Sequence, residues 1–423
     1  MTAEIVIINQ QGVAMAADSA VTFGSQGTQK IMNSAIKLFS LSRSEPVGVM
    51  IYGNADLLNI PWETFIKLYR KVHNSPLEKL EQYGVSFIEF LKSKVMLFSE
   101  EQQDNWAKNR ISVLYNEILE AVSNALTALS SKGIQITESI IHQHYESLIL
   151  EYVMILRGYN FVYPKEISPE LESKIIKITE EQINQTFLTV INSPDTNQQT
   201  KDALYELGRL AILNCTSVQA SGIVISGFGN EDIFPSVITY EIYGFFNGQL
   251  LYKVLEDKTC INENATEMTS VIIPFAQEDV VRSFLDGIHP ELFQYAISYT
   301  EKSIETMLNS SLVNLSPSIM PSQIANAFAS DLMVEMQNFM SRKLLSPMIN
   351  MIQALPKDEL ASMAEALVNM TAFRRKMAYG SLETVGGPID VAVISKGDGL
   401  VWVKRKHYFP AELNTHFFEN YFK

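Results

Sequence analysis

Thr2 and Asp18 are the two residues near the start of the sequence whose types and spacing could do chemistry. Removal of Met1 would make Thr2 an N-terminal threonine, which carries a nucleophile and a base in one residue. The hydroxyl is the nucleophile, and the free α-amine, whose ordinary pKa is about 7.7–8.0, is the base. A threonine in second position is common by itself, so this interpretation depends on the surrounding pattern.

The surrounding pattern predicts a β-hairpin that brings Thr2 and Asp18 to the same end. Residues 5–8 are a continuous β-branched run, residues 9–12 have the composition of a tight turn, and residues 13–17 are a second apolar run that ends at Asp18. In such a hairpin, the beginning of the first strand lies beside the end of the second. We therefore expect the threonine and the carboxylate to be neighbours.

A third residue enters through a resemblance. Residues 12–19 read Gly-Val-Ala-Met-Ala-Ala-Asp-Ser and resemble the GVxxAADS segment of proteasome β-subunits and of HslV, and the separation from Thr2 to Asp18 matches without a gap. In that family the aspartate orients a lysine whose charge lowers the pKa of the threonine amine. The resemblance assigns this role to Lys37, which begins a short apolar strand, whereas Lys30, the alternative, lies in a stretch without clean alternation. The other interpretation of Lys37 is an ordinary lysine at the end of a strand.

The segment at residues 48–56 resembles the family's GTMAGGAAD strand and helix start. By that resemblance, backbone N–H groups around Tyr52 and Gly53 form the oxyanion hole, and Met50 lies at the floor of a pocket for apolar side chains. The family has glycine where this chain has Tyr52, so we expect a bulky side chain that narrows access to the nucleophile. Thr22 matches the family's substrate-contacting threonine and would pair with the substrate backbone.

A second hairpin is predicted near the other end of the chain. Residues 385–403 contain two alternating runs around a Lys-Gly-Asp-Gly turn, and they resemble the last two strands of the same family. The family's supporting aspartate and serine fall here at Leu382 and Val385. Glu383 and Thr384, which lie between those positions, are the candidate substitutes.

Gln277 has two interpretations. It falls near the family's serine that hydrogen-bonds the N-terminal amine, and its amide oxygen can accept a hydrogen bond from that amine. Alternatively, Gln277, Glu278 and Asp279 simply begin a helix, whose first turn favours acidic residues. The sequence leaves both open.

The composition is that of a globular protein and excludes some partners. The chain has 423 residues, of which 47% are hydrophobic and 19% are charged, which is enough for a large core. Its net charge of −14 argues against nucleic acid and anionic membrane as main partners. It has two cysteines, Cys215 and Cys260, begins with a strand instead of a signal sequence, and contains no apolar stretch of about 20 residues. We therefore expect a cytoplasmic protein that does not span a membrane.

The sequence predicts no metal and no cofactor. The closest pair of histidines, His142 and His144, sits two residues apart in a helical pattern, and such residues point to different faces of a helix. We find no glycine-rich loop of the phosphate-binding type.

The order of the predicted elements indicates an α+β fold. The resemblance implies the αββα sandwich of N-terminal nucleophile (Ntn) hydrolases, in which two antiparallel sheets are covered by helices. The chain is longer than members of that family, and the excess has helical spacing. We expect the N-terminal part of the core at residues 1–100, a helical insertion at residues 101–215, and the remainder of the core at residues 216–423, with a further helical insertion at about residues 312–355.

The predicted function is cleavage of peptide (amide) bonds by an N-terminal threonine hydrolase, with peptide or unfolded protein as substrate. The resemblance implies a homo-oligomer, and the Met-rich stretches at residues 333–340 and 348–351 are the first candidates for its contacts unless they fill the core. By analogy with HslV, an ATP-dependent unfoldase is an expected partner. The alternatives are a non-catalytic assembly subunit, favoured by the lost supporting positions, and an amidase for a small molecule, favoured by Tyr52.

Overall fold

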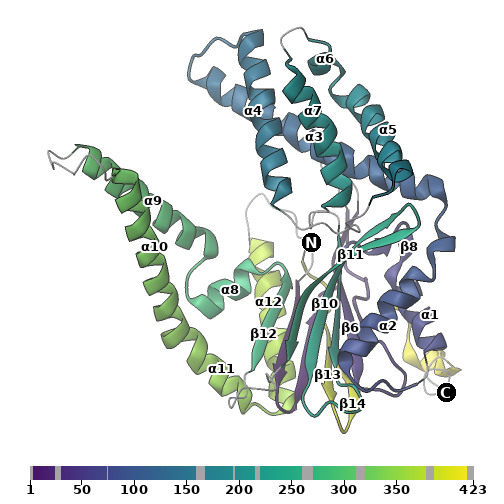
Figure 1. Cartoon of the computed structure of the whole chain (residues 1–423). Coiled ribbons are helices and arrows are strands. Elements are labelled where there is room, and N and C mark those ends of the chain that lie inside the picture. Colours follow the sequence, from purple (N-terminus) through teal and green to yellow (C-terminus); the bar gives the residue numbers. More distant parts are fainter. Residues whose placement is uncertain are drawn as a thin grey trace.

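Two five-stranded antiparallel sheets form the centre of the computed structural model, and helices lie outside them (Figure 1). A unit of long helices stands at one end of the sheets, and an arm of two further helices projects from the body beside it. The structure describes residues 3–23, 30–73, 75–158, 167–193, 196–214, 220–259, 270–310, 320–377 and 385–416.

The first sheet has the strand order β12-β1-β2-β13-β14. The predicted N-terminal hairpin is confirmed as β1 and β2, in which Glu4 pairs with Ala17 and Asn9 with Gly12. The Asn9 side chain stabilises the turn by accepting a 2.9 Å hydrogen bond from the backbone N–H of Gln11. The predicted C-terminal hairpin is present as β13 and β14. The strands are β1 (Ala3–Asn9), β2 (Gly12–Ala17), β12 (Val271–Ala276), β13 (Asp390–Ser395) and β14 (Gly399–Lys404).

The second sheet has the strand order β11-β10-β9-β6-β5. β6 pairs with β9 although helices α1 to α7 lie between them in the chain, so the intervening helices leave the sheet continuous. Two short strand pairs, β3 with β4 and β7 with β8, lie outside the main sheets. The strands are β3 (Val21–Phe23), β4 (Lys30–Met32), β5 (Leu38–Ser40), β6 (Val47–Gly53), β7 (Asp56–Leu57), β8 (Ile60–Pro61), β9 (Ser221–Gly227), β10 (Ser236–Phe246) and β11 (Gln249–Thr259).

An apolar core fills the space between the two sheets. Alternate residues of a strand point to opposite faces, so Val6 and Ile8 of β1 face the second sheet, whereas Ile5 and Ile7 face the covering helices. Met15 of β2 belongs to the core between the sheets. Because both faces are covered, all seven residues of β1 are buried.

Helices cover the outer face of each sheet. α1 and α2 share a core with the second sheet, and α8 and α12 share one with the first, where α12 lies across β1, β2 and β13. The predicted α+β class, with antiparallel sheets and covering helices, is confirmed. The bounds are α1 (Trp62–Val72), α2 (Leu80–Lys92), α8 (Asp279–Asp286) and α12 (Lys357–Met377), with 3₁₀ turns η1 (Val95–Leu97) and η3 (Ala411–Leu413).

The helical unit occupies the region where the sequence predicts the first insertion, and its core continues into the second sheet through Tyr243, Phe246 and Leu251. Trp106 of α3 fixes the unit to the second sheet by donating a 2.8 Å hydrogen bond to the carbonyl of Tyr243 in β10. Four of its helices have an N-cap residue whose side chain accepts a hydrogen bond from the backbone N–H of the residue three positions later. These N-cap residues are Ser99, Thr137, Ser168 and Asn197. The domain boundaries themselves remain a prediction. The helices are α3 (Glu100–Ser131), α4 (Glu138–Arg157), α5 (Pro169–Thr186), α6 (Leu188–Ile191) and α7 (Gln198–Leu213).

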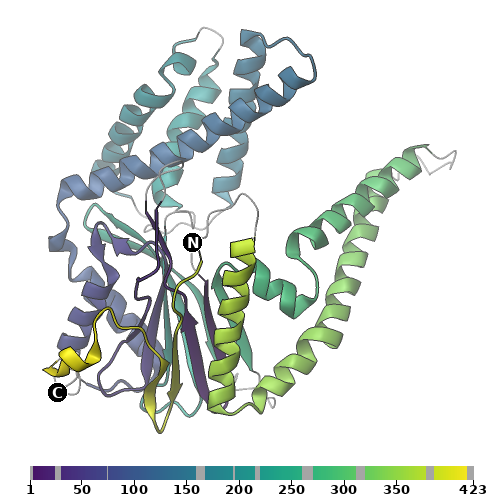
Figure 2. The same ribbon diagram turned by 180° about the vertical axis from the view of Figure 1, so that it is seen from behind.

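The arm consists of α9 and α10, which extend away from the body in both views (Figure 2). A small core of Phe293, Ile297 and Ala329 lies between them. A π-helical turn joins α10 to α11, whose end is tied to the first sheet by a 3.0 Å hydrogen bond from the Asn9 side chain to the carbonyl of Ile352. The bounds are α9 (Pro290–Ser310), α10 (Pro321–Met340), η2 (Ser341–Leu345) and α11 (Ser346–Gln353).

Replacing Met15 by alanine is expected to lower the free energy of unfolding by about 2–5 kcal/mol, because it leaves a cavity between the sheets. Denaturant titration of the whole protein measures this change. Met32→Ala is the matched control, since 54% of that methionine is exposed, and it is expected to cost less than about 0.5 kcal/mol. Equal losses from the two substitutions would contradict the placement of Met15.

Candidate functional site

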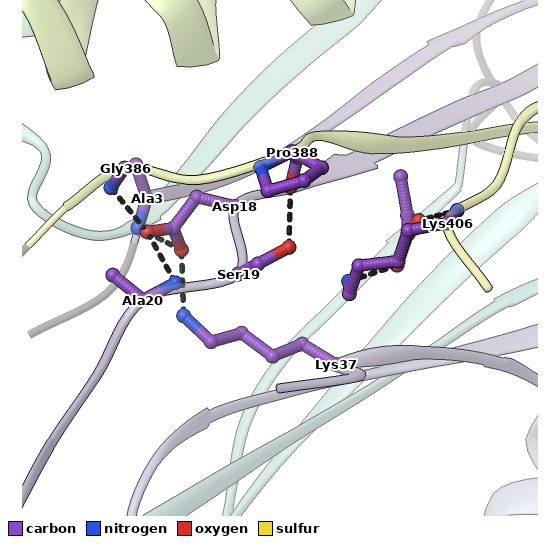
Figure 3. A network of polar contacts seen from close by, with 9 residues as sticks. Ala3, Asp18, Ser19, Ala20, Lys37, Gly386, Pro388 and Lys406 are labelled. Carbon is purple, nitrogen blue, oxygen red and sulfur yellow. Dashed lines mark hydrogen bonds and ion pairs between the residues drawn. The ribbon is translucent and has the colours of Figure 1, made fainter. Parts of the chain in front are cut away.

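Asp18 is the centre of a buried polar network at the end of the N-terminal hairpin (Figure 3). Its carboxylate accepts a 2.6 Å bond from Lys37 Nζ and a 3.1 Å bond from the backbone N–H of Ala3. It also accepts bonds from the backbone N–H groups of Ala20, at 3.2 Å, and Gly386, at 3.0 Å. One carboxylate therefore holds together the start of β1, the end of β2, the entry to β5 and the approach to β13.

The hairpin register explains why Asp18 and Ala3 meet. Glu4 pairs with Ala17, so the next residues along the two strands are opposite one another, and the Asp18 N–H donates a 3.1 Å bond back to the Ala3 carbonyl. Ser19 extends the network, because its hydroxyl donates to the carbonyl of Pro388. The predicted proximity of the strand start and Asp18 is thus built from local pairing.

The structure brings Lys37 to Asp18 and leaves Lys30 elsewhere. Lys37 lies immediately before β5, and its side chain is 7% exposed while that of Asp18 is fully buried. Lys30 is exposed in β4, where it pairs with Phe23 of β3. A buried ion pair costs desolvation energy and is compensated only by close contact and further hydrogen bonds, both of which Asp18 has.

Three of the predicted site residues, Thr2, Glu383 and Thr384, lie outside the described residues. The structure does define the neighbours of two of them. Ala3 is joined to Thr2 by a peptide bond whose nitrogen is 3.1 Å from the Asp18 carboxylate. Val385, which follows Thr384, is buried in the core beneath α12.

Gln277 follows Ala276, the residue of β12 that pairs with Ala3. Its side chain is buried, and its amide oxygen accepts a hydrogen bond from Arg375 of α12. The same arginine donates a 3.0 Å bond to Asp279 in the first turn of α8. The bond from Arg375 ties Gln277 to the start of α8, and the amide oxygen has a second lone pair, so both interpretations of Gln277 stay open.

A cavity of about 730 Å³ opens beside the Asp18–Lys37 pair. Thr22, Lys37, Ile51 and Gly53 contribute to one side of it. The hydroxyl oxygen of Thr22 is buried and has no hydrogen-bond partner among the residues that the structure describes. Gly53 has φ +78°, and a Cβ there would lie 2.3 Å from the carbonyl oxygen of Ala220, so only glycine fits this turn out of β6.

Helix α3 and the start of α1 form the other side of the same cavity. Gln102, Asn105, Trp106 and Asn109 follow helical spacing and therefore share one face of α3. Trp62, the first residue of α1, lines the cavity as well. The helical unit thus completes a pocket whose remaining walls come from the second sheet and the short strands beside it.

Met50 and Tyr52 do not line this cavity, contrary to the prediction for Met50. Met50 is fully buried between the sheets, and Ile51 takes the predicted place because adjacent residues of a strand point to opposite faces. The Tyr52 ring stacks on Phe275 at 5.5 Å between centroids and lies over Gly222. The ring therefore packs against the core between the sheets, and it lines a separate cavity of about 620 Å³.

Glu4 is a residue of this site that the sequence analysis missed. It lies on the face of β1 that points between the sheets, it is 1% exposed, and neither carboxylate oxygen has a hydrogen-bond partner among the described residues. Burial raises the pKa of the Glu4 carboxyl well above its usual value; Lys37 opposes the rise and Asp18 adds to it. A glutamate in an otherwise apolar strand was the available signal.

No group of three or more His, Cys, Asp or Glu residues in the described part of the chain could hold a metal ion. His142 bonds the Ser193 hydroxyl at 2.9 Å, and His144 bonds the carbonyl of Ile140 at 2.8 Å. Cys215 and Cys260 lie outside the described residues. None of the helices that the structure describes is both long enough and apolar enough to cross a membrane.

No protein-family model and no curated protein matches the chain. Among solved structures, it is similar to an Anbu (Gly-1) mutant from Hyphomicrobium sp. strain MC1, with 7% identity, a TM-score of 0.28, and 99% of this chain and 94% of that chain covered. It is also similar to Anbu (ancestral β-subunit) from Yersinia bercovieri, with 9% identity, a TM-score of 0.27, and 99% of this chain and 94% of that chain covered. The helical assembly of the Anbu complex from Pseudomonas aeruginosa shows 9% identity and a TM-score of 0.26, with 99% of this chain and 93% of that chain covered.

These structures correct the family named from the sequence. The expected relatives were proteasome β-subunits and HslV, whereas the similar structures are Anbu proteins. At such low identities and TM-scores, the likeness says nothing further about the fold or the function of this chain.

Replacing Asp18 by alanine is expected to lower the free energy of unfolding by about 3–5 kcal/mol, because it leaves the buried Lys37 ammonium unpaired. The double variant Asp18→Ala/Lys37→Met is expected to lose less than Asp18→Ala alone, since no uncompensated charge remains. Glu89→Ala, which breaks the exposed pair with Lys92, is the control and should cost at most about 1 kcal/mol. Denaturant titration gives all three values, and a double variant no better than Asp18→Ala would contradict the pairing.

Glu4 is expected to make the protein less stable as the pH rises. Its pKa is raised in the folded state, so its contribution to stability is complete below the unfolded pKa of about 4.3 and is lost as the pH rises toward the folded pKa. Relative to wild type, Glu4→Gln should gain up to about 1.4 kcal/mol per pH unit in this window. Unfolding titrations between pH 4 and pH 8 measure the difference, and Glu231→Gln, at an exposed position, should follow wild type.

Proposed function

We propose that the chain is an amide-bond hydrolase whose nucleophile is the Thr2 hydroxyl, freed at the N-terminus by removal of whatever precedes it. One observation carries the proposal. The buried Asp18 carboxylate binds both the ammonium group of Lys37 and the backbone N–H of Ala3, the residue bonded to Thr2. The ammonium group of Lys37 is thereby held close to the start of β1, next to which a free α-amine of Thr2 would lie.

In this mechanism the Thr2 amine takes the hydroxyl proton as the oxygen attacks the substrate carbonyl. The charge of Lys37 lowers the pKa of that amine and so favours its neutral form. The backbone N–H groups around Gly53 stabilise the oxyanion. The protonated amine then gives its proton to the leaving nitrogen, the C–N bond breaks, and water hydrolyses the resulting ester to restore Thr2.

The cavity beside Lys37 supports a peptide as the substrate. Its volume of about 730 Å³ is within the range of about 300–1,000 Å³ that is typical of ligand pockets. In the proposal it receives the side chain of the residue whose carbonyl is attacked, and the Thr22 hydroxyl binds the substrate backbone. Asn105 and Trp106, on the α3 side of the cavity, would contact that side chain.

We further infer that the layers of helices, sheet, sheet and helices are the αββα sandwich of Ntn hydrolases. The support is that β1 begins beside Asp18 and that helices pack on the outer face of each sheet. In this interpretation residues 101–215 and about 312–355 are helical insertions into that sandwich.

The proposal is tested by N-terminal sequencing and intact mass after incubation with a peptide epoxyketone, a reagent that needs both the amine and the hydroxyl of an N-terminal threonine. We expect Thr2 to be the first residue, the wild-type protein to be labelled, and Thr2→Ala to stay unlabelled. Lys37→Met should slow labelling about 100-fold or more, because the amine becomes protonated. Lys30→Met, which removes the exposed lysine, is the matched control and should label at the wild-type rate.

Retention of residues before Thr2, or equal labelling of Thr2→Ala, would contradict the proposal and favour a non-catalytic assembly subunit. Labelling of Thr2 together with hydrolysis of small amides but of no peptide would instead identify a small-molecule amidase. Digestion of a peptide mixture, followed by mass spectrometry, separates these two enzymatic outcomes.

A further inference from the structure

The walls of the cavity beside Lys37 combine apolar and polar side chains. Helix α3 supplies three carboxamides at helical spacing, and the segment from the end of β6 to the start of α1 supplies two more, together with two carboxylates. A purely apolar substrate side chain would displace water from these groups and offer no hydrogen bonds in return, which costs free energy. The carboxamide residues are Asn54, Asn59, Gln102, Asn105 and Asn109.

Two side chains of the cavity wall also contain buried polar atoms without a partner among the described residues. Trp62 is 1% exposed, and its indole N–H has no acceptor there. The hydroxyl oxygen of Thr22 is in the same condition. Buried polar groups in proteins are normally hydrogen-bonded, so these two atoms indicate that the cavity receives a molecule with polar groups of its own.

The charge of the cavity wall is negative. Asp56 and Glu63 are its carboxylates, and Lys37, the one cation among the described residues that line it, is engaged in the buried ion pair. Glu63 pairs with the exposed Lys67 of the same helix. Asp56 is exposed, accepts a 3.0 Å hydrogen bond from the backbone N–H of Asn59, and forms no ion pair within the described part of the chain. Asp56 is therefore the carboxylate that is available to an incoming positive charge.

These observations favour a substrate side chain with a long apolar stem and a positively charged end. The stem of a lysine or an arginine can lie along apolar wall residues such as Ile51 and Trp106 while the charged end reaches a carboxylate. The bound substrate excludes water from that contact and so strengthens the attraction. An acidic side chain would instead be repelled by Asp56 and Glu63.

We propose that the cavity selects a lysine or arginine side chain in the residue whose carbonyl Thr2 attacks, and that Asp56 determines this specificity. The inference rests on the proposed function, because it names the substrate of that same site. It differs from the apolar preference expected through Met50, a residue that does not line the cavity.

Four peptide epoxyketones that differ only in the residue next to the reactive group test the proposal on the full-length protein. That residue is arginine, citrulline, leucine or glutamate, and citrulline has the shape of arginine without its charge. We expect the arginine reagent to label Thr2 about 10-fold or more faster than the citrulline reagent, because hydrogen bonds between charged groups are stronger than neutral ones. The glutamate reagent should be the slowest. Intact mass against time gives the four rates.

Substitutions of Asp56 test its role. Asp56→Asn is expected to bring the arginine and citrulline rates within about twofold of each other, because asparagine keeps the acceptor for the Asn59 N–H and lacks the charge. Asp56→Lys should reverse the order, so that the glutamate reagent labels faster than the arginine reagent, which a merely structural defect would not produce. Asp202→Asn, at an exposed position of α7, is the matched control and should keep the wild-type ratio.

The experiment separates the failure of this inference from the failure of the proposed function. If none of the four reagents labels Thr2, the proposed function is wrong, and so is the inference. If Thr2 is labelled fastest by the leucine reagent, or equally by the arginine and citrulline reagents, the inference alone is wrong. An unchanged ratio of arginine to citrulline labelling in Asp56→Asn would show that Asp56 does not select the charge.

Discussion

The buried contact between Asp18 and Lys37 is the interaction on which the site depends. Asp18 lies in the hairpin of the first sheet and Lys37 at the edge of the second, so their ion pair connects the two sheets at one end. The cost of burying the Asp18 carboxylate is offset because the backbone N–H groups of Ala3, Ala20 and Gly386 also donate hydrogen bonds to it. The apolar core between the sheets then continues from this polar end, beginning with Val6 and Met15.

The parts of the fold with local signals could be predicted from the sequence. The N-terminal hairpin follows from a tight turn at Asn9 to Gly12 between two apolar runs, and this pairing brings Ala3 to Asp18. The pairing of Lys37 with Asp18 is different, because it joins two sheets and has no local pattern. Lys37 was found only through a resemblance whose family name the solved structures correct.

The remaining errors have short-range physical causes. Met50 and Ile51 are adjacent in β6, and a shift of one residue exchanges the two faces of a strand, so the assignment of a pocket residue failed while the strand itself was right. Tyr52 was expected beside Thr2, which lies outside the described residues, and Gly222 on the paired strand leaves room for the tyrosine ring between the sheets. Glu4 was overlooked because an apolar run was treated as uniform, although a charged residue at a core position is the more informative one.

Helix α3 has 32 residues and is therefore about 48 Å long. Near its beginning, Trp106 bonds the second sheet and helps to line the cavity, while most of its remaining length belongs to the core of the helical unit. The same helix is thus both a wall of the cavity and a central element of the helical unit. A substitution in the core of that unit that displaces α3 would therefore change the shape of the pocket although the substituted residue lies outside it.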